Sequence, residues 1–167
     1  SGPLPGAAHA GGHAGNNHGY GKLTKPGPDR RRQRMSYYIS ARLKVSFDDA
    51  IARTEAALKT EGFGVISRID IQQTLKSKID VDFRPYTILG ACNPKLAHEA
   101  LQQEDKVGLM LPCNVIVQQS DNGEVEVAAI DPVASMQAIP NPELVKAAEV
   151  VREKLAHTID RLRQSEM

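Results

Sequence analysis

The sequence predicts an α+β fold, in which a mainly antiparallel β-sheet carries helices packed on one face as a two-layer sandwich. Several segments alternate apolar and polar residues with a period of two, which is typical of half-buried strands. Others repeat apolar residues at helical spacing behind a capping residue. A Ser-Asp-Asn-Gly turn at 120–123 joins two strand segments directly, and such short turns connect antiparallel neighbours.

The first predicted strand covers residues 37–45, where every odd position is apolar. Ser46 then has the character of an N-cap, and acidic residues follow it in the first turn, where the helix dipole favours them. Apolar residues recur at helical spacing over 47–61. Gly62 is a typical helix stop, so the first helix is expected to end there.

A second strand is predicted from Phe63 to Ile71. It is antiparallel to the first strand if the intervening helix folds back over the sheet, and parallel if that helix is a crossover. A short helix is predicted between Asp70 and Asp80. The third strand is expected to begin near Pro85, because a strand start tolerates a residue that donates no ladder hydrogen bond.

Asn93 and the proline after it are typical of an N-cap and a first helical residue, and they predict a helix to about Gln103. Residues 111–119 and 124–130 read as a hairpin of two strands. Asn141 repeats the capping pattern and opens the last helix, whose apolar residues follow an a/d rhythm. A stripe of apolar residues with this spacing, here called the a/d seam, can pack on the sheet or on a second subunit.

Residues 1–34 are rich in Gly, Pro, Ala, Asn and His and almost lack large aliphatic side chains, so they cannot offset the entropy of ordering. We expect residues 1–35 to form a disordered leader, either vector-derived or a native flexible tail. Residues 36–167 are then expected to form a single α+β domain.

The composition excludes several classes of partner. Lysine and arginine number 21 and aspartate and glutamate 20. The net charge of +1 is therefore not the excess of basic residues that is typical of proteins that bind nucleic acid. No apolar run is long enough to span a membrane. Two cysteines do not make a disulfide scaffold, and no secretory signal is evident, so we expect a cytoplasmic protein without membrane or nucleic-acid partners.

Three phrases of the sequence together carry a family resemblance. They are DFRPYTILGACNP at 82–94, LPCNV at 111–115 and DP at 131–132. The chain resembles the bacterial and archaeal domain-of-unknown-function family numbered 302 from Tyr37 to about Leu162. The resemblance implies a compact α+β domain that tends to pair into homodimers, and it implies no established activity.

Cys92 is a candidate reactive residue. It is expected at the end of the third strand, immediately before Asn93, and a thiolate near a helix N-terminus is stabilised by the helix dipole and the free amides. The alternative is a packing role, because a small residue suits a tight turn from strand to helix and free cysteine often behaves as a small buried hydrophobe.

Cys113 shares a predicted strand face with Leu111 and Val115, which favours a packing role. If its strand is the antiparallel neighbour of the strand ending at Cys92, both thiols lie at one end of the sheet. In a parallel crossover they lie at opposite ends, too far apart for a disulfide. We predict that both cysteines are reduced and that Cys92 is the more reactive.

Neither a metal nor a cofactor is predicted. Cys92, His98 and Cys113 lack the close paired spacing of zinc modules. The sequence contains no phosphate-binding loop, dinucleotide glycine fingerprint, Gly-x-Ser-x-Gly elbow or His-Glu-x-x-His helix, so no catalytic residue and no enzyme class is indicated.

Tyr86 completes the candidate residues. With Asp82 and Arg84 it could line a ligand pocket, although a buried tyrosine with a satisfied hydroxyl explains the same pattern. We expect an uncharacterised homodimeric module that binds a small molecule or a partner protein. The alternative is a thiol-dependent redox or transfer protein that uses Cys92.

Overall fold

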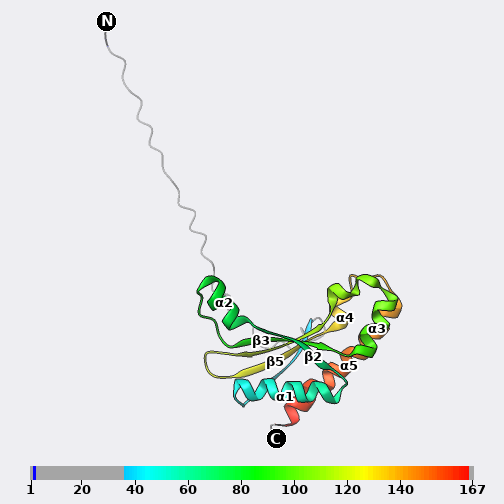
Figure 1. Cartoon of the computed structure of the whole chain (residues 1–167), viewed down its shortest axis with the longest axis horizontal. Helices are drawn as coiled ribbons and strands as arrows, with labels where there is room; N and C mark the ends of the chain where they lie inside the picture. The colour runs from blue at the N-terminus through cyan, green and yellow to red at the C-terminus, as the bar shows by residue number, and fades with distance from the viewer. Residues whose placement is uncertain (1, 3–35, 166–167) are drawn as a thin grey trace.

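The computed structural model describes residue 2 and residues 36–165 of the chain. In this part, five strands form one sheet in the order β1-β5-β4-β3-β2, with every neighbouring pair antiparallel (Figure 1). The strands are β1 (Tyr38–Leu43), β2 (Gly64–Asp70), β3 (Tyr86–Cys92), β4 (Cys113–Gln119) and β5 (Val125–Ile130). The helices are α1 (Phe47–Thr60), α2 (Ile71–Ile79), α3 (Pro94–Gln103), the 3-10 helix η2 (Asp105–Met110), α4 (Pro132–Ser135) and α5 (Pro142–Gln164).

The predicted α+β class and mainly antiparallel sheet are confirmed. Apart from residue 2, the predicted leader lies outside the described residues, so the division of the chain at residue 35 stays a prediction.

Helices α1 and α5 form the second layer of the fold. Val115 of β4 and Val127 of β5 are fully buried on the sheet face that these helices cover. Leu58 of α1 and Leu155 and Ile159 of α5 pack into the same cluster. The shorter helices α2 and α3 lie at the two ends of β3 (Figure 1), so the helical layer over the sheet is made mainly by two helices.

The a/d seam of the last helix is occupied within the chain. Leu144, Ala148, Leu155 and Ile159 of α5 are all buried. Along its length, α5 contacts β1, α1, α3 and α4. The sequence left two packing partners open for this seam, the sheet and a second subunit. In the structure the seam packs into the core of its own chain.

The open question about the first two strands is decided by the sheet order. Strands β1 and β2 lie at opposite edges of the sheet and run in the same direction, because four antiparallel pairings separate them. Helix α1 is therefore a crossover from one edge to the other, and β2 pairs with β3 rather than with β1.

The predicted helix ends are confirmed by their capping bonds. Ser46 Oγ accepts a hydrogen bond from the Asp49 amide at 3.1 Å. Gly62 has a φ of 81°, which favours glycine, and it ends α1 as expected. Strand ends are less accurate, since the predicted strands 37–45 and 111–119 begin at Tyr38 and Cys113. Helices η2 and α4 were not predicted.

The hydrophobic interior is divided into two clusters. The larger one, here the sheet cluster, lies between the sheet and the helices α1 and α5. The smaller one, here the end cluster, joins α3, η2, α4 and the first turns of α5. Its buried members are Ala100, Val107, Met136, Leu144 and Ala148. No helix in the described ranges is long and apolar enough to cross a membrane.

Candidate functional site

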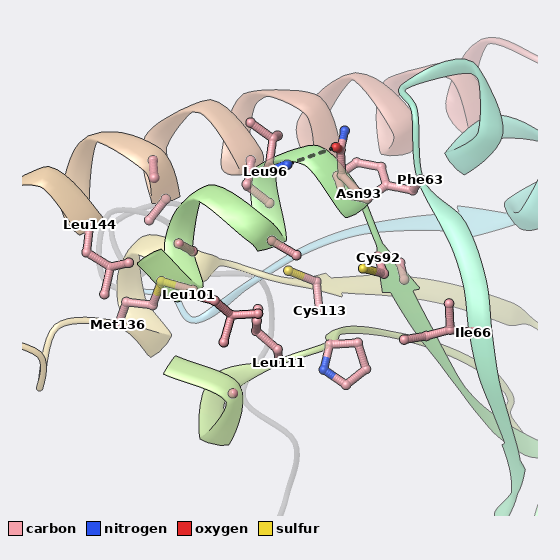
Figure 2. Close-up of a pocket in the computed structure, with 18 residues that line it drawn as sticks. Phe63, Ile66, Cys92, Asn93, Leu96, Leu101, Leu111, Cys113, Met136 and Leu144 are labelled. Carbon is pink, nitrogen blue, oxygen red and sulfur yellow. Dashed lines mark hydrogen bonds between the residues drawn. The ribbon is translucent and has the colours of Figure 1, made fainter. Parts of the chain in front are cut away.

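A cavity of about 370 Å³ lies between the two hydrophobic clusters, where the ends of β3 and β4 meet α3, η2 and α5 (Figure 2). We call it the α3 pocket. Its lining is almost wholly apolar: Phe63, Ile66, Ala91, Cys92, Asn93, Leu96, Ala97, Ala100, Leu101, Gly108, Leu111, Pro112, Cys113, Met136, Leu144, Ala147, Ala148 and Val151. Pockets for small molecules commonly start at about 300 Å³ and have such walls.

The apolar stripe of α3 forms one wall of this pocket. Leu96, Ala97, Ala100 and Leu101 all line it, as the helical spacing of these residues would place them on one side. Of the four, only Ala100 is buried, and Leu101 is 44% exposed. This face of α3 is therefore incompletely covered by the rest of the protein.

The two thiols line the same pocket. Cys113 lies directly opposite Ala91 in the pairing of β4 with β3, and Cys92 is the next residue along β3. The antiparallel alternative considered for these strands is therefore correct, and it brings both cysteines to one end of the sheet. Neither is paired in a disulfide in this structure, and the reduced state of the resting protein stays a prediction.

The environments of the two thiols differ. Cys113 is 6% exposed, whereas Cys92 is half-buried. Burial, with a smaller contribution from nearby Cys92, raises the pKa of the Cys113 thiol to about 11. At neutral pH Cys113 is therefore a protonated side chain facing an apolar space.

Asn93 fixes the start of α3 beside Cys92. Its Oδ1 accepts a hydrogen bond from the Leu96 amide at 3.3 Å (Figure 2), so it is the predicted N-cap. The end of α1 approaches closely, since a Cβ on Gly62 would lie 3.0 Å from Asn93 Nδ2. The local geometry at the start of α3 thus depends on the capping bond of Asn93 and on the absence of a side chain at Gly62, which follows α1.

His98 and Tyr86 do not join this site. His98 is exposed on α3 and is absent from the pocket wall. Asp82 and Arg84 line a second hollow of about 400 Å³, which is polar and lies near the opposite end of β3. Tyr86 lines neither of these two hollows.

Several polar side chains around the second hollow are hydrogen-bonded to one another. Arg84 Nε donates to Gln118 Oε1, and Gln118 Nε2 donates to Glu126 Oε1, both at 2.9 Å. The Arg84 guanidinium also lies 5.5 Å from the centre of the Tyr86 ring. Burial raises the pKa of Tyr86, and the positive charge of Arg84 opposes that shift. This arrangement is that of a structural network rather than of an open binding site.

Comparison with known proteins identifies the family and supports the overall fold. The family model described as domain of unknown function DUF302 matches residues 39–162. The chain belongs to the DUF302 family. This DUF302 chain is also 30% identical to an uncharacterized conserved protein DUF302 from Bacillus stearothermophilus, whose crystal structure superposes with a TM-score of 0.71. The match covers 76% of this chain and 98% of that one. No curated protein matches.

Most residues of the α3 pocket were not candidates from the sequence. Cys92, Asn93 and Cys113 were candidates, whereas the four α3 residues of the wall were not. Met136 and Leu144 come from α4–α5 and carry no local signal of a ligand site, because an apolar residue in a wall looks like an apolar residue in a core. The one available signal was the number of small residues on α3 and α5, since alanines leave space where helices meet.

Proposed function

We propose that this DUF302 chain binds an apolar small molecule in the α3 pocket and acts as a homodimer. The observation that carries the binding proposal is the cavity of about 370 Å³ between the two clusters. Among the side chains of its wall, two thiols and one amide are the polar groups. Recognition would therefore rest on apolar burial and shape, at roughly 25 cal/mol for each Å² removed from water.

This pocket favours a small molecule over a partner protein as the ligand. A protein partner would need a broad contact surface, whereas the α3 pocket is concave and lies at the junction of helices with strand ends. A cytoplasmic location stays a prediction, and it is compatible with two free thiols.

The binding proposal can be tested with Nile red, a neutral apolar dye whose fluorescence rises in apolar surroundings. Ala147→Phe places a ring in the pocket wall of α5 and should weaken dye binding at least tenfold. Ala156→Phe is the matched control, because Ala156 is a half-buried alanine of the same helix outside the pocket. Equal dye binding by the wild-type protein and both variants would reject the α3 pocket as the site.

The dimer proposal is supported by a surface other than the α5 seam. Helix α2 has no buried residue, and Ile79 on it is 63% exposed. Ile69 on β2 and Val81 after α2 are exposed as well. We propose that these three residues lie on one surface, which we call the outer aliphatic patch. Because a two-fold dimer pairs the same patch from both copies, one exposed apolar surface is enough to form it.

A second candidate function is a thiol-dependent redox or transfer reaction at Cys92. The observation that favours it is that Cys92 is half-buried and lines the pocket, so a bound molecule would touch its sulfur. The rate of Cys92 alkylation by iodoacetamide against pH tests this. A reactive thiolate would still be alkylated quickly well below pH 8, whereas an ordinary thiol would not.

A further inference from the structure

The two cysteines occupy positions from which their sulfur atoms can meet. Cys92 follows Ala91, the direct cross-strand partner of Cys113. With strands about 4.8 Å apart and a rise of about 3.4 Å per residue, their Cα atoms are separated by about 6 Å, within the range that a disulfide spans. A regular pleat sends consecutive residues to opposite faces, but β3 ends at Cys92 and both side chains line one pocket (Figure 2).

The Cys113 thiol is the feature that a packing role leaves unexplained. It is 94% buried, has no hydrogen-bond partner among the described residues and faces the α3 pocket. Alanine or valine would fill a wall position without a polar atom. A second thiol in the same pocket, one position away across the sheet, adds a chemical capability that neither cysteine has alone.

We propose that the α3 pocket takes an apolar organic disulfide and that Cys92 and Cys113 reduce it by thiol–disulfide exchange. The inference rests on the proposed binding of apolar molecules in this pocket. The apolar walls suit the organic groups of such a substrate, and the two thiols are the groups that react with its sulfur–sulfur bond.

The first step uses the more exposed thiol. The Cys92 thiolate attacks one sulfur of the substrate R–S–S–R′, so a Cys92–S–S–R bond forms and the substrate S–S bond breaks. The leaving thiolate R′–S⁻ takes up the proton that Cys92 lost to solvent. The group R stays in the pocket, held by the mixed disulfide and by the α3 wall.

The second step uses the buried thiol. Cys113 loses its proton, and its sulfur attacks the Cys92 sulfur, which forms a Cys92–Cys113 disulfide and expels R–S⁻, which becomes R–SH. Two electrons have then passed from the cysteines to the substrate, and the two thiol protons are on R–SH and R′–SH. Small monothiols in solution would return the pair to the reduced form by two further exchanges of the same kind.

The test uses one equivalent of 4,4′-dithiodipyridine, an apolar aromatic disulfide whose released thiopyridone absorbs light. The full chain should release two thiopyridones for each probe molecule and become two hydrogen atoms lighter by mass spectrometry. Cys113→Ala should release one and retain the probe as a mixed disulfide. Cys92→Ala should react at least tenfold more slowly, because its remaining thiol is buried. A wild-type protein that stops at the mixed disulfide would overturn the inference.

Nile red separates this inference from the binding proposal. The wild-type protein should bind the dye, and both cysteine variants should give the circular dichroism spectrum of the wild-type protein, which shows that they are folded. Normal dye binding with no second thiopyridone would reject the exchange and leave the pocket as a binding site. Release of two thiopyridones that Ala147→Phe does not slow would place the exchange outside the pocket and reject the inference.

Discussion

The buried thiol of Cys113 couples the stability of the fold to alkaline pH. Its pKa rises from 9.0 to about 11 on burial. Below the unfolded value both states keep the proton, and between the two values only the unfolded chain loses it, so stability falls as the pH rises through this window. We expect the free energy of unfolding of the wild-type protein to fall by of the order of 2 kcal/mol more than that of Cys113→Ala over this window.

Urea unfolding of both proteins at several pH values between 8 and 11 measures this difference. Cys113→Ala removes a buried sulfur and lowers stability at every pH, so the comparison concerns the slopes and not the absolute values. Lysine and tyrosine titrations contribute equally to both proteins and cancel. Parallel curves for the two proteins would show that the Cys113 thiol does not keep its proton on folding.

At the scale of elements, the Asn93 cap controls the wall of the pocket. Asn93→Ala removes the acceptor for the Leu96 amide and should lower the free energy of unfolding by about 1 kcal/mol. Because α3 supplies four residues of the lining, we also expect weaker Nile red binding. Urea unfolding and dye titration measure the two effects.

Asn93→Asp is the matched control for this prediction. A carboxylate accepts the same bond and interacts favourably with the helix dipole, so this variant should keep the wild-type stability to within about 0.5 kcal/mol. If the aspartate variant were as unstable as the alanine variant, the contribution of Asn93 would lie elsewhere than in its capping bond.

The elements themselves could largely be predicted, because their signals are local. Ser46, Asn93 and Asn141 each cap the helix that the sequence assigned to them. The turn at 120–123 likewise fixed one strand pairing. Helix η2 was missed because six residues are too few to show a period, and strand ends shifted because alternation continues beyond the last ladder hydrogen bond.

At the scale of the whole molecule, the outer aliphatic patch predicts a dimer. Light scattering at high micromolar concentration should give twice the mass of one chain for the wild-type protein. Ile79→Asp should give the monomer, because two buried carboxylates would face each other across a two-fold axis. Val150→Asp is the matched control, since Val150 is an exposed aliphatic residue of α5 outside the patch.

Two outcomes would contradict this assignment. A wild-type protein that stays monomeric would remove the dimer altogether. A dimer that survives Ile79→Asp but not Val150→Asp would transfer the interface from α2 to the outer side of α5.

The sheet order and the pocket could not be predicted, for one physical reason. Both depend on which segments meet after collapse, and no local pattern in β1 identifies β5 as its partner. The α3 pocket likewise draws its wall from β3, α3, η2 and α5 at once. The cysteines were candidates only because their chemistry is visible in the sequence without knowledge of their neighbours.

The position of β1 at the edge of the sheet also has a consequence for synthesis on the ribosome. Within residues 36–165 its only strand partner is β5, and paired residues such as Leu43 and Val125 are more than 80 positions apart. At about 5 to 20 residues per second, β1 and α1 wait roughly 5 to 15 s before β5 has been translated. During that interval Ala41 and Leu43 have no sheet to join. The apolar side chains of β1 are therefore exposed on the nascent chain until β5 has been made. That is the stage at which a chaperone would act.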